Sequence, residues 1–118
     1  MPFRAELKKG FVLVRHEGVV TPEEAEASSV EALRLARMNK VSRVIVDLRG
    51  VTNEPDPRDL RSVMEGTAEI TPPRPHAAII VREDQHPQFR FIEDFAASRG
   101  MPIRVFIDED EAVNWLVE

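Results

Sequence analysis

The 118-residue sequence contains no cysteine and no tyrosine. Without cysteine the chain can form no disulfide, zinc–thiolate site, iron–sulfur cluster or thiol nucleophile. Its longest uninterrupted apolar run, residues 77–81, is far shorter than the about 20 residues that a membrane-spanning helix needs. The first ten residues lack the apolar core of a signal peptide. These absences predict a cytoplasmic protein that does not insert into a membrane.

The sequence also lacks the common motifs of catalysis and cofactor binding. Its five glycines are scattered and form neither GxGxxG nor a P-loop. His16, His76 and His86 do not have the i, i+4 spacing of a helical metal site, and no GxSxG nucleophile motif accompanies them. Each histidine stands at the boundary of an expected element, where a solvated or capping role is usual. We therefore expect no metal, no cofactor and no enzymatic activity.

Acidic residues outnumber basic ones, and the formal net charge is −5. Binding to the phosphate backbone of a nucleic acid needs a basic face, so we expect no nucleic-acid partner.

Hydrophobic periodicity predicts five strands. Phe3, Ala5 and Leu7 alternate with charged residues, and Lys9-Gly10 leads into a second strand at 11–16, so the chain should open with a β-hairpin. The unbroken apolar centres at 43–48, 76–82 and 103–107 are typical of strands that are buried on both faces of a parallel sheet.

Helix-start signals separate these strands. Thr21-Pro22 with Glu24 predicts a capping box and a helix that ends near Met38, where Asn39 would adopt the left-handed conformation. Asp56-Pro57, Pro87 and Asp108 should begin three more helices, the second of which ends at Gly100. The inner stripe of the first helix is expected to comprise Val30, Leu33 and Ala36 with Ala25 and Ser29, leaving Leu35 on the far side.

The predicted order is ββαβαβαβα, which defines an α/β open sheet with a mostly parallel core and an N-terminal antiparallel hairpin. The length fits one domain that spans residues 1–118. The proline-rich stretch at 72–75 is short enough to be a stiff connector rather than a domain linker.

Two segments carry a resemblance to a known family. The strand at 103–108, followed by Glu111-Ala112 and Trp115-Leu116, and the VDLRG segment at 46–50 resemble the SpoIIAA-like proteins along nearly the whole chain. That family belongs with the STAS domains and is sometimes grouped with the CRAL-TRIO lipid-binding fold. The resemblance implies a STAS-like fold, but it implies little about function.

STAS anti-sigma-factor antagonists carry a phosphorylatable serine at the start of the helix that follows the VDLRG strand. In this sequence Asp56 or Pro57 stands at that position, and the nearest hydroxyl, that of Thr52, lies earlier in the loop. Asp56 therefore either supplies a permanent negative charge or, more simply, caps the helix.

In open α/β sheets, ligands and partners bind beyond the carboxyl ends of the parallel strands. The polar residues expected at that edge follow the third and fourth strands: Arg49, Thr52, Asn53, Asp56, Arg82, Asp84 and His86. Their mixed charges favour recognition of a protein surface or a small polar ligand.

The sequence predicts a non-catalytic regulatory or protein-interaction module without the phosphoacceptor serine. The alternative is a small carrier or sensor of an apolar, lipid-like ligand, suggested by the CRAL-TRIO grouping and by four aromatic residues expected to cluster in the last third of the chain: Phe89, Phe91, Phe95 and Trp115. Ordinary core packing is the simpler explanation of these aromatics. A homodimer could form through the hairpin edge or the Leu35 face.

Overall fold

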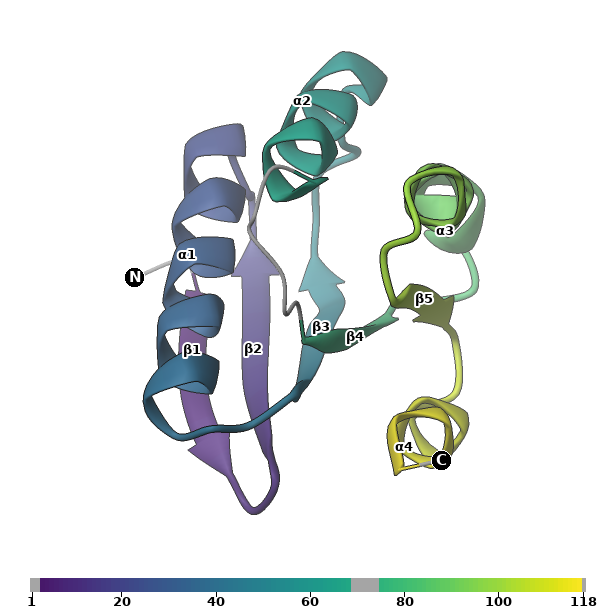
Figure 1. Cartoon of the computed structure of the whole chain (residues 1–118). Helices are drawn as coiled ribbons and strands as arrows, with labels where there is room; N and C mark the ends of the chain where they lie inside the picture. Colours follow the sequence, from purple (N-terminus) through teal and green to yellow (C-terminus); the bar gives the residue numbers. More distant parts are fainter. Residues whose placement is uncertain (1–2, 69–74, 118) are drawn as a thin grey trace.

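The computed structural model describes residues 3–68 and 75–117 (Figure 1). Its elements follow the predicted ββαβαβαβα order, and residues 72–74 of the proline-rich stretch lie outside the described residues. The strands are β1 (Phe3–Lys8), β2 (Phe11–Gly18), β3 (Arg43–Val51), β4 (His76–Ile80) and β5 (Ile103–Phe106). The helices are α1 (Pro22–Met38), α2 (Pro57–Ala68), α3 (His86–Ser98) and α4 (Glu109–Val117).

The strands form one sheet in the order β1-β2-β3-β4-β5. β1 pairs antiparallel with β2, whereas β2, β3, β4 and β5 pair in parallel. The predicted hairpin and parallel core are therefore confirmed. Because parallel strands all end at the same edge, the connections that follow β2, β3, β4 and β5 come together there.

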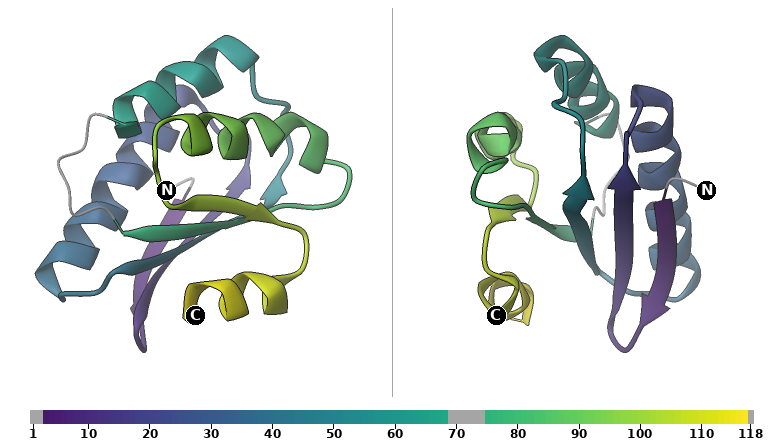
Figure 2. Two further views of the ribbon diagram at one scale, coloured as in Figure 1. Left: turned by 45° about the vertical axis from the view of Figure 1, so that its right-hand side comes forward. Right: turned by 180° about the vertical axis from the view of Figure 1, so that it is seen from behind.

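The helices are divided unequally between the two faces of the sheet (Figure 2). Side chains alternate along each strand, so Val14, Val46 and Ile79 point to the face that packs against α1, α2 and α3, here called the three-helix face. Ile45, Ile80 and Phe106 point to the other face and pack against α4, and we call this the α4 face. α4 packs mainly against β4 and β5.

α1 packs on the sheet through small residues. The inner stripe predicted for this helix was therefore partly wrong. Ser28, Ala32 and Ala36 are buried, whereas Val30 is 62% exposed. Leu35 packs against the buried cluster of β2 and β3, so it does not lie on a free face. The prediction gave weight to the large apolar Val30, but a helix approaches a sheet most closely through small side chains. Leu35 is therefore only partly exposed, and self-association through its face or through the hairpin edge stays a prediction.

The ends of the helices follow the sequence signals with one exception. Thr21 and Glu24 form the predicted capping box at the start of α1. At the other end Lys40, with φ 54°, takes the left-handed conformation that was expected of Asn39. Asn39 has φ −104°, and its side-chain amide instead donates to the carbonyl of Leu35 at 2.9 Å. Gly100 leaves α3 at φ 65°, as predicted.

The aromatic residues of the last third do not form the single expected cluster. Phe89 and Phe95 are buried on the three-helix face, with Phe91 beside them. Trp115 packs on the α4 face against Phe106, so the sheet separates it from the phenylalanines. Most of these side chains are ordinary core, and only Phe89 lines the cavity described below.

Candidate functional site

The connection between β3 and α2, residues 52–56 and here called the β3–α2 loop, is fixed to the neighbouring β2–α1 connection. The Asn53 side chain accepts from the Val20 backbone N–H at 2.8 Å and donates to the Val20 carbonyl at 3.0 Å. The Thr52 N–H also donates to the Gly18 carbonyl at 2.9 Å. The loop is thus held by three hydrogen bonds, while Thr52 and Glu54 remain exposed.

Asp56 stands directly before α2 and caps it. Its carboxylate accepts from the Arg58 N–H at 2.8 Å and forms an ion pair with the Arg58 guanidinium at 3.4 Å. These hydrogen bonds from Arg58, the backbone one first, lower the pKa of Asp56, so that the carboxylate is charged at neutral pH. The geometry is that of a helix cap, and it also leaves a fixed negative charge at the exposed start of α2.

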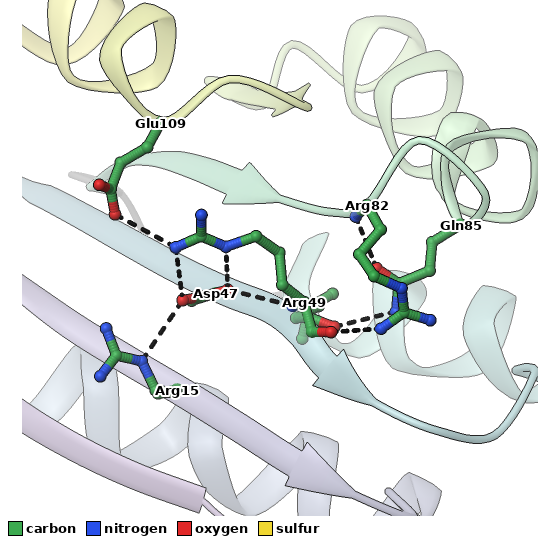
Figure 3. Close-up of polar contacts among 7 residues, drawn as sticks. Arg15, Asp47, Arg49, Arg82, Gln85 and Glu109 are labelled. Carbon is green, nitrogen blue, oxygen red and sulfur yellow. Dashed lines mark hydrogen bonds and ion pairs between the residues drawn. The ribbon is translucent and has the colours of Figure 1, made fainter.

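The Arg49 side chain, by contrast, lies on the α4 face of the sheet, where it forms ion pairs (Figure 3). Its guanidinium donates twice to the carboxylate of Asp47, at 3.0 Å in both cases, and pairs with Glu109 of α4 at 3.2 Å. Arg15 of β2 approaches the same carboxylate at 3.3 Å. The network joins β2, β3 and the first turn of α4, so the role of the Arg49 side chain in this structure is to connect elements.

Asp47 is the central group of this network and is only 5% exposed. Burial by itself raises the pKa of Asp47. The hydrogen bonds from the Arg49 side chain and backbone and the charges of Arg49 and Arg15 outweigh that effect, so the pKa is lowered from the usual 3.8. Asp47 and Arg49 are two residues apart in a strand and therefore share a face, a signal in the sequence that the prediction did not use.

The β4–α3 connection holds the carboxyl end of β3. The buried Gln85 side chain donates to the Leu48 carbonyl at 2.9 Å and accepts from the Arg82 N–H at 2.7 Å. The Arg82 guanidinium donates to the carbonyls of Arg49 and Val51 and pairs with Asp84 at 3.0 Å (Figure 3). β3 continues past the last residue of β4, so these side chains replace the strand neighbour that its carbonyls lack.

The predicted site residues thus fall into two groups. Arg49, Arg82 and Asp84 belong to one hydrogen-bonded network at the end of β3, whereas Asn53 and Asp56 fix the β3–α2 loop. His86 is half-buried at the first residue of α3. Gln85 was missed because a polar residue before a helix is ordinarily solvated.

His16 was expected to be a solvated residue at a strand end, and this expectation is wrong. β2 continues to Gly18, so His16 follows Val12 and Val14 onto the three-helix face, where it is 2% exposed. Its Nε2 lies 2.9 Å from Ser28 Oγ in α1. Burial lowers the pKa of His16 from the usual 6.5, and the charge of Glu24 opposes part of that effect.

The lowered pKa of His16 predicts a loss of stability in mild acid. Unfolded chains bind a proton near pH 6.5, whereas the folded protein does so only at lower pH, so the free energy of unfolding should fall as the pH drops below 6.5. Asp47 adds nothing in that window, because its stabilising effect is lost only below its usual pKa of 3.8. Urea unfolding across this range should show a smaller pH dependence for His16→Asn than for the wild type. An equal dependence in both proteins would contradict this role of His16.

A cavity of about 490 Å³ lies between α1, α2 and the three-helix face of the sheet. Its walls are mainly aliphatic, and they include Val46, Leu48, Leu60, Val63 and Met64. The cavity is partly open to solvent, so it is a groove between α1 and α2 rather than an enclosed void in the core. His16 lines the cavity, and the β3–α2 loop contributes Asn53, Glu54 and Asp56 to its wall.

The described ranges contain no group of three or more histidine, aspartate or glutamate side chains that could hold a metal ion. None of the helices in the same ranges is long and apolar enough to cross a membrane.

Comparison with solved structures identifies the fold. The crystal structure of an anti-sigma factor antagonist from Mycobacterium paratuberculosis matches with a TM-score of 0.64 at 15% sequence identity, over 98% of this chain and 93% of that chain. No protein-family model matches the sequence, and no curated protein does. The chain therefore has the α/β fold of an anti-sigma factor antagonist. The predicted STAS-like fold is confirmed.

Proposed function

We propose that the protein is a single-domain, non-catalytic regulatory module that binds a partner protein through the β3–α2 loop and the start of α2. The observation that carries this proposal is the way the loop is fixed. Asn53 bonds both polar groups of the Val20 backbone, so the exposed Thr52 and Glu54 are presented in one conformation before a partner arrives. Preorganisation of this kind lowers the entropic cost of association.

The charges at this surface indicate what it would bind. Glu54 is exposed, Asp56 keeps its charge at neutral pH, and Asp59 follows in the first turn of α2. Arg58, which pairs with Asp56, is also exposed between Asp56 and Asp59, so the surface carries mixed charge with an acidic excess. A partner with a complementary basic patch fits this surface. The name of the structural neighbour suggests an anti-sigma factor as the class of partner. The fixed charge of Asp56 would be present without phosphorylation, so binding would not depend on a kinase.

A second candidate function is binding of an apolar small molecule. It is supported by the cavity of about 490 Å³ under the β3–α2 loop, whose volume lies within the range of about 300–1,000 Å³ that is usual for ligand pockets. Binding of a partner at the loop does not require that the cavity be filled, so the two functions can be tested separately.

Charge reversal at the loop tests the first candidate. Immobilised wild-type protein and the Glu54→Arg variant would be exposed to an extract of the cells that make the protein, and the captured proteins identified by mass spectrometry. We expect one partner that is retained by the wild type and reduced at least about tenfold by Glu54→Arg, since like charges would then face each other.

Asp94→Arg is the matched control, because it makes the same change of charge at an exposed position of α3. It should retain the partner at the wild-type level. Equal capture by all three proteins would contradict binding at the β3–α2 loop, and equal loss in both variants would show that only net charge matters.

A further inference from the structure

β1 stands at one end of the strand order, and one row of its backbone groups faces away from β2 (Figure 2). Lys8 and Phe11 face each other across a two-residue turn, a geometry in which their backbone groups bond to each other. Because the bonding residues alternate along an antiparallel pair, Phe3, Ala5 and Leu7 point their N–H and C=O groups outward. Such a row is a template for pairing with another strand.

The charged side chains beside this edge are not fully matched within one molecule. Arg4, Glu6 and Lys8 share the α4 face of β1, and Glu6 pairs with Lys8 at 3.0 Å. Arg4 is directly opposite Arg15 of β2, where like charges repel. Arg15 is held by Asp47 at 3.3 Å, whereas the 79% exposed side chain of Arg4 has only a contact of 3.8 Å with Glu6 among the described residues. Arg4 can therefore take a carboxylate from beyond the edge.

The other face of β1 presents apolar side chains at the same edge. Leu7 is 45% exposed, whereas Phe3 and Ala5 are half-buried. α1 packs over β1 on this face, so a second sheet joined at the edge would bring its own α1 alongside the first (Figure 2). An added strand with apolar residues at the matching positions would cover Leu7.

Antiparallel pairing of two β1 strands has one register in which all of these groups match. With Ala5 opposite Ala5 at a two-fold axis, Phe3 faces Leu7 of the other copy and Arg4 faces Glu6 of the other copy. The outward backbone groups of the odd-numbered residues then meet each other. Each ion pair and each apolar pair occurs twice because of the symmetry, and cross-strand pairs of both kinds stabilise a sheet.

The neighbouring registers fit less well. Centring the axis on Glu6 sets Glu6 against its own copy and Arg4 against Lys8, and centring it on Arg4 sets two arginines against each other. Centring it on Leu7 brings Glu6 opposite Lys8 but carries the pairing into the turn, so fewer strand residues take part. Shifts by an odd number of residues place the outward groups against groups that already bond β2.

We propose that the protein forms a two-fold symmetric homodimer in which the β1 strands of two copies pair with Ala5 at the axis. The pairing joins two five-stranded sheets into one continuous sheet. The occupant of this edge is a second copy because the order of charged and apolar residues along β1 is complementary to itself. The surface does not include the β3–α2 loop, so the proposal is independent of the function proposed above.

A charge exchange tests the ion pairs of the interface. In analytical ultracentrifugation the wild type should be a dimer at a concentration on the order of 100 µM. Arg4→Glu and Glu6→Arg each set like charges against each other, so each should raise the dissociation constant of the dimer at least about tenfold. An equal mixture of the two variants should dimerise again, because each new side chain then faces the opposite charge on the other chain.

Matched controls make the same changes of charge at exposed positions of α3. Arg90→Glu and Asp94→Arg should dimerise as the wild type does. Circular dichroism would verify that each variant is folded.

Cross-linking tests the register, since the chain has no cysteine of its own. In a mixture of Arg4→Cys and Glu6→Cys proteins the two thiols face each other, so oxidation should yield a covalent dimer. Either variant alone should not be cross-linked, because its two thiols lie about 8 Å apart across the axis, beyond the reach of a disulfide.

A monomeric wild type, or a dimer that neither Arg4→Glu nor Glu6→Arg weakens, would overturn the proposal. Failure of the mixed charge variants to dimerise would contradict the ion pairs. Cross-linking of Glu6→Cys alone would place Glu6 at the axis and overturn the register.

Discussion

Replacing Gln85 with leucine is expected to lower the free energy of unfolding by about 2–4 kcal/mol, because buried polar groups would lose their partners. The side chain is 4% exposed and bonds the Leu48 carbonyl and the Arg82 N–H. Leucine has a similar volume but can make neither hydrogen bond. Urea unfolding of the wild type and the variant measures the difference.

The effect should also be local. Gln85 replaces the missing strand neighbour at the end of β3, so hydrogen exchange of the backbone at 48–53 should accelerate in Gln85→Leu more than exchange in α4. Gln88→Leu is the control, since Gln88 is half-buried one turn further along α3. A stability loss no larger than that of Gln88→Leu would mean that the carbonyls of β3 find other partners.

Ile80→Ala is expected to be the most destabilising of the substitutions considered, by about 2–5 kcal/mol. Ile80 lies at the end of β4, is 0% exposed and packs with Phe106, Ala112 and Leu116 on the α4 face. Truncation removes buried apolar surface and leaves a cavity that α4 cannot fill without moving. At roughly 4 °C per kcal/mol, the melting temperature should fall by about 8–20 °C.

The chain offers an internal control for this substitution. Ile107 follows β5 and is 45% exposed. Ile107→Ala removes the same side-chain atoms as Ile80→Ala, but we expect it to lower the free energy of unfolding by only about 1 kcal/mol or less. Thermal unfolding followed by circular dichroism compares the two variants. Similar shifts in both would contradict the packing of α4 against β4 and β5.

Local signals were sufficient to predict the element order. The capping box of Thr21 and Glu24, the Asp56-Pro57 start and the turn at Gly100 each act within a few residues, and the structure contains each helix boundary that they indicated. The parallel core followed from the alternation of strands and single helices, because such connections cross from one strand to the next in the same direction.

The contacts that hold the candidate site could not be predicted in the same way. Asn53 and Val20 are separated by 33 residues, and Arg82 reaches the Val51 carbonyl across 31. Pairings of this kind depend on strand order, which periodicity does not reveal. The sequence located Arg49 and Arg82 at the correct edge of the sheet, but it could not show that both side chains hold parts of the fold together.

The cavity was equally beyond prediction. The volume of about 490 Å³ depends on how α1 and α2 are placed over the sheet and relative to each other, because residues of both helices and of the sheet line it. Leu60, Val63 and Met64 recur at the i, i+3, i+4 spacing of an amphipathic stripe, and in α2 they do face inward. Whether such a stripe meets the core or lines an open space is decided by tertiary packing.

Binding at the β3–α2 loop is tested most directly by hydrogen–deuterium exchange of the protein with and without its captured partner. We expect the partner to slow exchange in the loop 52–56 and the first turn of α2, with exchange in α4 unchanged. Protection confined to α4, or to the edge strand β1, would contradict the proposed docking surface.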